Sequence, residues 1–391
     1  MFESVCIRRQ QPLYTSEPLD MGFLAEAMLF YQNVHLIADI DILLQLVPLC
    51  GPALLNEFIE EGYLQISYLE KRTSISKYNE GPFRDLYRPF TLLDAEGSWK
   101  LEKVAPEIFS RVAGGPGWGR QLGMRFAELV PTLDIGEELI SAARTDFADQ
   151  HYSENAVAQL LSVLAPTYRF PQDHRFKVSK EDDKFRVDTN IDFRQANESF
   201  NRHWQTTGDI LSPSMLLEYV FEARNDVLIA SRMNAELATQ PGTAAIIDVK
   251  FRKILNARSK SQHNIEAFQE MVLANSHEIG ESIKSGFRTW RDLLVLLKQA
   301  RKFKEKFLAQ KDPDASLTHE YIKALEKETW FGTPPMKVLH FLIFTGGGLL
   351  VPAVAALGLS AADTFIVDRL LGGWRPNQFV NGPLKGFARL D

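Results

Sequence analysis

Apolar side chains recur at helical spacing along much of the chain and dominate its second half. From residue 213 onward they step by three or four residues, in stripes that begin at Leu216, Ile265 and Leu293. A period near 3.6 residues is typical of helices that pack one apolar face against another helix. The pattern therefore predicts a mainly helical second half, with every sheet placed before residue 190.

The first 105 residues mix helical and alternating patterns. LDMGFLAEAMLFY has apolar positions on one helical face, and the branched residues of VHLIA (34–38) predict a short strand. Two short helices broken at Pro48 and Gly51 should follow, and then a strand over 64–69. Residues 1–105 are thus predicted to form a small α+β domain.

The middle of the chain, 106–205, is predicted to be helical with one β-hairpin. Two alternating segments around an acidic turn in FKVSKEDDKFRVD indicate the hairpin at about 176–188. GGPGWG (114–119) lacks the Gly-Lys-Ser/Thr ending of a phosphate loop, so it is interpreted as a flexible helix–helix connection. The third region, 206–391, is predicted to be a helical bundle, which makes the whole fold mainly α with a small N-terminal α+β unit.

A long uncharged stretch lies near the end of the bundle. From 338 to 362 there are 25 residues without a charged side chain at neutral pH. About 20 apolar residues suffice to span a bilayer, but three consecutive glycines at 346–348 and Pro352 divide the segment. The composition favours a glycine-rich apolar helical hairpin buried in the bundle. Insertion into a membrane after a conformational change stays open as the alternative.

Composition places the chain among ordinary globular proteins. Of its 391 residues, 45% are hydrophobic and 24% charged, and the formal charge of −6 argues against a nucleic-acid partner. The two cysteines, Cys6 and Cys50, suit a reducing compartment, and no apolar run follows the N-terminal arginines as in a signal peptide. A cytoplasmic location is therefore expected.

Positive charge is concentrated in one window. Residues 284–311 hold nine Lys/Arg against two acids, a charge of +7, so the rest of the chain carries −6 − 7 = −13. A basic amphipathic helix can lie on the inner face of an anionic cell membrane. Alternatively, it can be a core helix with a solvated basic face. The candidate membrane or partner surface comprises Arg288, Arg291, Lys298, Lys302 and Lys306.

Common metal and nucleophile motifs are missing from the sequence. There is no HxxxH or CxxC spacing for zinc and no G-x-S-x-G around a serine. The sequence therefore predicts no metal site and no cofactor.

One arrangement resembles the core of a metal-dependent nuclease. Asp248-Val-Lys250 follows an apolar run, and Asp226 and Glu218 lie upstream, as in the PD-(D/E)xK type. That geometry needs strands. The period of 3.6 in Ala244, Ile247, Phe251 and Ile254 favours a helix, on which Asp248 and Lys250 point apart.

Both ends of the chain resemble an uncharacterised family of bacterial proteins. The resemblance is carried by LDMGFLAEAMLFYQNVHLIAD near the start and by FTGGGL and DTFIVDRLLGGWRPNQFV near the end. It covers about the first 70 and the last 180 residues. It implies a bacterial source and no known reaction, and no functional residue can be transferred from it.

Three functions remain open from the sequence. The first is an intracellular protein that acts by interaction, with a protein partner or as a membrane-active effector in a stress or antiviral response. The second is the metal-dependent nuclease, with Glu218, Asp226, Asp248 and Lys250 as its catalytic residues. The third is a structural or scaffolding subunit. The first is favoured, and on that interpretation the protein is not an enzyme.

Overall fold

The fold is a mixed α/β fold in which 57% of the described residues are helical and 18% lie in strands. The computed structural model describes residues 2–10, 18–71, 73–80, 85–92, 94, 96–233, 235–249, 279–308, 384 and 387. Two four-stranded sheets, one parallel and one antiparallel, overturn the predicted mainly α fold with a small α+β unit. The prediction failed because short strands paired across distant parts of the chain leave little local signal.

The parallel sheet has the strand order β3-β2-β1-β8. Its strands are β1 (Phe2–Ile7), β2 (Tyr31–Ala38), β3 (Gln65–Tyr68) and β8 (Glu236–Ala238). β8 pairs with β1 from Val5↔Glu236 to Ile7↔Ala238, and the strands β2 and β3 predicted from the sequence are confirmed. β8 shows that a sheet strand lies beyond residue 190, contrary to the prediction.

The antiparallel sheet has the order β4-β5-β7-β6. Its strands are β4 (Thr73–Asn79), β5 (Asp85–Thr91), β6 (Phe176–Glu181) and β7 (Lys184–Thr189). The predicted hairpin is confirmed as β6 and β7, with Asp182 at a φ of 54° in the turn between them. Residues 85–91 and 176–189 therefore meet in one sheet although they lie far apart in the sequence.

Helix side chains bond to both outer strands of this sheet. At β6, the Gln150 amide donates to the Phe176 carbonyl (3.1 Å) and accepts from the Val178 amide (3.2 Å). At β4, the Glu218 carboxyl accepts from the Ile75 amide (3.1 Å). Backbone groups that no neighbouring strand can reach are thereby satisfied by side chains.

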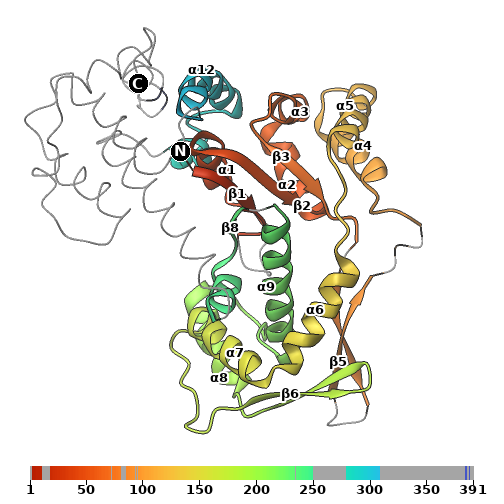
Figure 1. Ribbon diagram of the computed structural model, residues 1–391, viewed down its shortest axis with the longest axis vertical. Coiled ribbons are helices and arrows are strands. Elements are labelled where there is room, and N and C mark those ends of the chain that lie inside the picture. The colour runs from red at the N-terminus through yellow and green to blue at the C-terminus, as the bar shows by residue number, and fades with distance from the viewer. Residues whose placement is uncertain are drawn as a thin grey trace, which may run out of the picture. The chain divides into compact units, whose positions relative to one another are not determined.

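The contacts divide the chain into two units. The smaller comprises Met1–Ser4, Met21–Val34 and Arg258–Asp391, and the larger comprises Val5–Asp20 and His35–Ala257. The smaller contains α1 (Met21–Phe30), α11 (Ile279–Lys284) and α12 (Trp290–Leu308). The larger contains α2 (Ile40–Cys50), α3 (Pro52–Glu60), α4 (Leu101–Val112), α5 (Pro116–Leu129), α6 (Gly136–Ala148), α7 (Gln150–Leu164), α8 (Phe193–Trp204), α9 (Pro213–Met233) and a helix over 241–249. Figure 1 shows these elements, coloured along the chain. The predicted three-part division at residues 105 and 205 stays a prediction.

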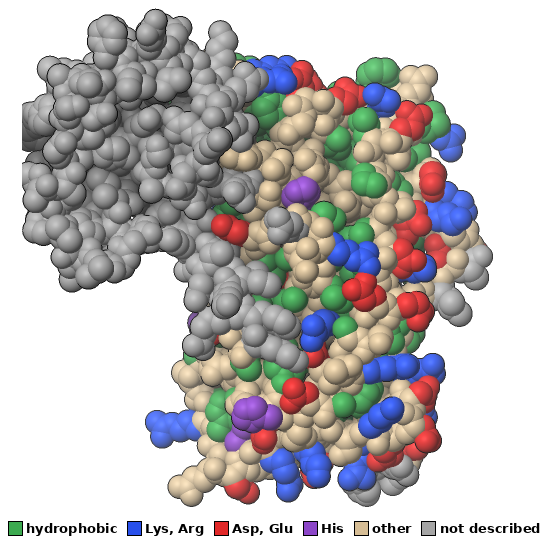
Figure 2. Space-filling model, viewed as in Figure 1, with side chains coloured by type: hydrophobic (Ala, Val, Ile, Leu, Met, Phe, Trp, Pro, Cys, Tyr) green, Lys and Arg blue, Asp and Glu red, His purple; other side chains and the backbone are tan. Residues whose placement is uncertain are grey.

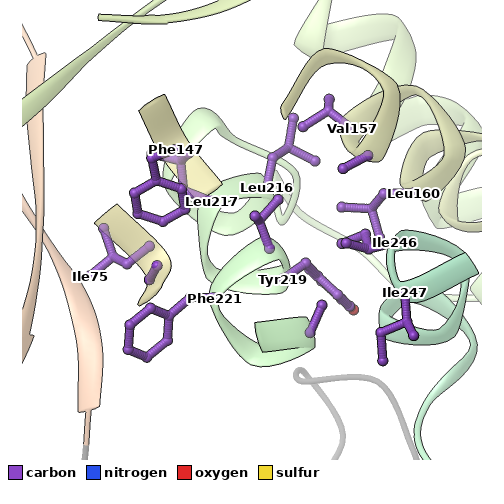
Figure 3. Packing of buried hydrophobic residues seen from close by; sticks show 14 of the residues in the cluster. Ile75, Phe147, Val157, Leu160, Leu216, Leu217, Tyr219, Phe221, Ile246 and Ile247 are labelled. Carbon is purple, nitrogen blue, oxygen red and sulfur yellow. The ribbon is translucent and has the colours of Figure 1, made fainter. Parts of the chain in front are cut away.

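Helix α9 provides the centre of the larger unit's core. Leu216, Leu217, Tyr219 and Phe221 from α9 are at most 1% exposed. Figure 3 shows them between Ile75 of β4, Phe147 of α6, Leu160 of α7 and Ile246 of the 241–249 helix. The apolar stripe that predicted a helix from Leu216 is thus confirmed, although the helix ends at Met233 and not at Leu237.

The break between α2 and α3 lies at one of its two predicted positions. Pro48 is inside α2, and the chain turns at Gly51, whose φ of 83° favours glycine. α2 and α3 together pass a length and hydropathy test for a membrane span but are bent by 102°, and no single helix in the described ranges passes it. The predicted apolar hairpin at 338–362 lies outside the described residues.

Helices α4 and α5 pack closely because α5 presents glycines to α4. A Cβ added at Gly123 would lie 2.5 Å from Pro106 Cα, and one at Gly119 would lie 2.6 Å from Ser110 Cα. Gly119 is the last glycine of GGPGWG, so this motif is only partly the predicted connection. Its first two glycines precede α5, and the rest begins the helix.

Replacing Gly123 with alanine should therefore destabilise the protein by about 1–3 kcal/mol, since the new methyl group clashes with backbone. Gly117 in the same helix has no neighbouring atom within 4 Å of an added Cβ. Gly117→Ala should instead stabilise the protein by about 0.5–1 kcal/mol through helix propensity. Urea denaturation of both variants measures the difference. Equal effects would show that Gly123 is not a packing position.

Candidate functional site

Polar residues meet where the parallel strands end. Arg8 follows β1, Thr239 follows β8, and Asp39 follows β2 and caps α2 by accepting a hydrogen bond from the Ile42 amide (2.9 Å). The Arg8 amide donates to the Ala238 carbonyl (3.2 Å), so Arg8 and β8 are adjacent. The chain continues from β1 to β2 on one side of β1, while β8 lies on its other side. In open parallel sheets, ligands commonly bind at such a switch point.

The Arg8 guanidinium is held by acceptors from α9. Its Nη1 donates to Glu222 Oε2 (2.9 Å) and Asp226 Oδ1 (2.5 Å), and its Nη2 donates to the side-chain oxygen of Asn225 (3.2 Å). The Thr239 hydroxyl donates to the other oxygen of Asp226. We call Arg8, Glu222, Asp226 and Thr239 the Arg8 cluster.

The cluster forms because α9 repeats an acid every fourth residue. Glu218, Glu222 and Asp226 therefore lie along one face of the helix. The side chains of Arg8 and Asp226 are 9% and 4% exposed, whereas that of Glu222 retains 18%. Glu222 is thus the acid of the Arg8 cluster that a molecule in solution can reach most easily.

Burial and pairing act in opposite directions on the charges of the cluster. Burial alone would lower the pKa of Arg8, but the carboxylates of Glu222 and Asp226 raise it above its ordinary value. Burial raises the pKa of Asp226 to about 6, against the opposing effect of the Arg8 charge. Burial also raises the pKa of the neighbouring Cys6 thiol to about 12, which argues against a nucleophilic cysteine here.

The cluster carries more acid than base. The formal charges of Arg8, Glu222 and Asp226 sum to 1 − 2 = −1, and Asp39, outside the cluster, acts on Arg8 electrostatically. On the face shown in Figure 2, acidic and basic side chains are interleaved over the described surface. The described part of this face therefore carries no large patch of a single charge sign.

Buried polar atoms without a hydrogen-bond partner in the described structure occur next to the cluster in the sequence. Gln240 and Thr243 follow Thr239 at the start of the 241–249 helix and are 2% and 0% exposed. The Gln240 Oε1, the Thr243 Oγ1 and the Arg8 Nε are the atoms concerned. Buried polar atoms are nearly always paired in folded proteins, so these atoms are candidates for pairing with a ligand or ordered water.

Glu218 lies one turn before Glu222 and makes different contacts. Its Oε2 accepts from the Ile75 amide (3.1 Å) and the Ser74 hydroxyl (3.3 Å) of β4. Burial, with a smaller contribution from the negative charge of Glu222, raises the pKa of Glu218 to about 8. The neutral form of this carboxyl is therefore favoured compared with that of an ordinary glutamate.

Two of the four proposed nuclease residues lie on the acidic face of α9, but not on strands. Glu218 and Asp226 are two helical turns apart, with Glu222 between them. Asp248 lies in the 241–249 helix, and Lys250 is outside the described residues. Within the described ranges, no three His, Cys, Asp or Glu side chains form a group that could hold a metal ion. The strand geometry on which the nuclease hypothesis depends is missing from the described segments.

The predicted basic surface lies on and just before α12. Leu293, Leu294, Leu296 and Leu297 of α12 are at most 2% exposed. Arg291 and Lys298 are exposed, while the half-buried Arg288 donates from Nε to the Phe387 carbonyl (2.8 Å). The side chains of Lys302 and Lys306 are outside the described part. The leucine face of α12 is thus occupied within the fold, as in a core helix with a solvated basic face.

A second buried ion pair joins α6 to α9. The Arg224 Nε donates to Asp146 Oδ2 (2.6 Å), and its Nη2 donates to Oδ1. The Asp146 side chain is 1% exposed and that of Arg224 is 15% exposed. One cation faces one anion here, so this pair is balanced and structural, unlike the Arg8 cluster.

Sequence reasoning missed Arg8, Glu222 and Thr239. One signal was available: Glu222 and Asp226 interrupt an apolar helix at a spacing of four residues, which places two acids on one turn of a buried element. Nothing local points to Arg8, because its partners follow more than 200 positions later. No family model, curated protein or solved structure matches the chain.

Proposed function

We propose that the protein acts by binding a small ligand with a positively charged amine or guanidinium group at the Arg8 cluster. The single observation that carries the proposal is the excess of acid over base in the Arg8 cluster, where partly exposed Glu222 adds to the buried Arg8–Asp226 pair at the switch point of the parallel sheet. A cationic group placed beside Glu222 would offset that excess, because opposite charges attract strongly where water is partly excluded. The protein would then be a binding protein whose ligand is a small molecule, in place of the protein or membrane partner predicted from the sequence.

Neighbouring acceptors support the same ligand class. Gln240 Oε1 and Thr243 Oγ1 are buried oxygens without a hydrogen-bond partner among the described residues. An ammonium or guanidinium group carries several N–H donors and could pair with such oxygens as well as with Glu222. An anionic ligand would instead be repelled by Glu222 and Asp226.

A thermal-shift titration tests the proposal with agmatine and spermidine as cationic probes and with inorganic phosphate and ATP as anionic ones. We expect the cationic probes to raise the Tm, since a ligand at about 100 times its Kd adds about 2.7 kcal/mol of stability. Glu222→Gln should remove most of this shift. Glu198→Gln, at an exposed acid on α8, is the matched control and should keep it.

Two outcomes would contradict the proposal. Stabilisation by phosphate or ATP that exceeds the effect of the amines would indicate an anion site. An amine effect that persists in Glu222→Gln would place the amine elsewhere on the molecule.

The other functions predicted from the sequence have less support. The membrane-active effector depends on residues 338–362, outside the described part, and on α12, whose leucine face is occupied. The nuclease depends on strand geometry that segments 213–233 and 241–249 lack. A scaffolding role has no specific observation in its favour.

A further inference from the structure

The acidic face of α9 touches two different parts of the larger unit. Asp226 and Glu222 bind Arg8 at the end of the parallel sheet, and Glu218 binds β4 at the edge of the antiparallel sheet. Successive acids are four residues apart, a spacing at which like charges on a helix repel each other. A change of charge at Glu218 therefore changes the electrostatic potential at Glu222.

Glu218 occupies an edge of β4 that no strand of the described ranges covers. Ile75 lies opposite Pro89 of β5, and β4 is an outer strand of its sheet. The Ile75 amide is bonded to Glu218 instead of to another strand. Ile75 itself is 7% exposed and belongs to the core, so the Glu218 contact ties α9 to a buried part of β4.

The charged surroundings of Glu218 favour its neutral form. Glu222 acts on it electrostatically and raises the pKa of Glu218 in the same direction as burial. The hydrogen bonds from Ile75 and Ser74 lower this pKa, but their effect is smaller than that of burial and Glu222. The elements packed against α9 carry further titratable groups: Lys77 on β4, paired with Asp85; Glu138 and Asp146 on α6, paired with Arg232 and Arg224; His151 and Glu154 on α7; and Glu236 on β8.

We propose that the protonation of Glu218 controls the contact between α9 and β4. We call the hydrogen bonds of Glu218 to Ile75 and Ser74 the clasp. With its proton bound, Glu218 stays on Ile75 and Ser74. Once ionised, it faces both the cost of burial and repulsion from Glu222. Both are relieved when the partly exposed side chain turns towards water, and the hydrogen bonds to β4 are then lost.

The clasp is also linked to the Arg8 cluster, a step that rests on the proposed function. Ionised Glu218 adds one negative charge next to Glu222, which strengthens binding of a cationic ligand there. Linkage is reciprocal, so a bound cation should lower the pH at which Glu218 loses its proton.

Amide hydrogen exchange at Ile75 tests the clasp without any ligand. Between about pH 6 and about pH 10, which bracket the pKa of Glu218, the protection of the Ile75 amide, corrected for its intrinsic exchange rate, should fall at least about tenfold in the wild type. Glu218→Gln keeps an acceptor but cannot ionise, so its protection should not change over this range.

 Glu222→Gln removes the repulsion between the two acids. The midpoint of the change in Ile75 protection should therefore lie at a lower pH than in the wild type, and the change itself should be smaller.

Wild-type protection at Ile75 that stays constant across this range would overturn the clasp, as would a Glu218→Gln variant that titrates like the wild type. Glu198→Gln, the exposed control on α8, should titrate like the wild type. Repeating the measurement with agmatine tests the linkage. If agmatine does not bind while Ile75 still titrates, the proposed function fails and the clasp stands. If agmatine binds without moving the midpoint, the linkage is wrong.

Discussion

Replacing Arg8 with methionine should destabilise the protein by about 3–5 kcal/mol near neutral pH, because two buried carboxylates lose their shared cation. Methionine keeps much of the length and apolar volume of the arginine stem, so the change mainly removes charge and hydrogen bonds. Glu222 and Asp226 both bond to Arg8 Nη1, and their side chains are only 18% and 4% exposed. Urea denaturation followed by circular dichroism measures the loss.

The loss should depend on pH with a definite sign. Without Arg8, the pKa of Asp226, already raised to about 6 by burial, should rise further. A group with a raised pKa in the folded state contributes its stability below the unfolded pKa and loses it as pH rises through the folded pKa. The destabilisation of Arg8→Met should therefore be smallest near about pH 4 and grow up to about pH 8.

Two further variants separate this effect from a general loss of packing. Adding Glu222→Gln and Asp226→Asn to Arg8→Met removes the unpaired charges and should recover part of the stability. Arg111→Ala breaks an exposed pair on α4 whose side chains are both 64% exposed, and it should change stability by less than about 0.5 kcal/mol. A pH-independent loss in Arg8→Met would show that the two carboxylates are not the cause.

Replacing Asp146 with leucine should cost a similar amount, about 3–5 kcal/mol, but without the pH dependence. The variant leaves the Arg224 guanidinium without its bidentate partner, with 15% of its side chain exposed. An arginine remains protonated throughout the accessible pH range, so acid cannot relieve the unpaired charge. The free energies of unfolding of Asp146→Leu and of a matched reference variant should therefore differ by the same amount at about pH 5 and at about pH 8, within about 0.5 kcal/mol.

The same two helices supply that reference. Glu138 of α6 pairs with Arg232 of α9, and their side chains are 49% and 41% exposed. Glu138→Leu should cost less than about 1 kcal/mol, because an exposed ion pair contributes little. A double variant, Asp146→Leu with Arg224→Leu, should be more stable than Asp146→Leu alone. If Glu138→Leu proves as costly as Asp146→Leu, burial does not set the strength of these pairs.

Sequence patterns predicted elements well where the signal is local. The hairpin at 176–188 and the helix from Leu216 are confirmed because alternation and 3.6-residue spacing are properties of neighbouring residues. β1 and β8 were missed for the opposite reason. β8 has three residues, and its partner at Val5–Ile7 lies at the other end of the larger unit's sequence. The mixed α/β fold depends on that pairing, so it could not be predicted from local patterns.

The candidate site was predicted in part and for a different geometry. Glu218 and Asp226 were chosen as acids upstream of Asp248, on the assumption of strands. They matter in the structure because α9 is a helix, on which a spacing of eight residues returns to the same face. Arg8 became visible only once β1 and β8 were paired, since that pairing brings the residue after β1 to α9.

The side chains at the two edges of the antiparallel sheet have a consequence for self-association. An open edge strand is a template on which strands of other copies can add, and this is a common route to aggregation. Gln150 occupies backbone groups of β6, and Glu218 occupies one of β4. Another copy could extend either edge only by displacing a side chain that is already hydrogen-bonded there. These residues of α7 and α9 should therefore oppose the addition of a strand at either edge.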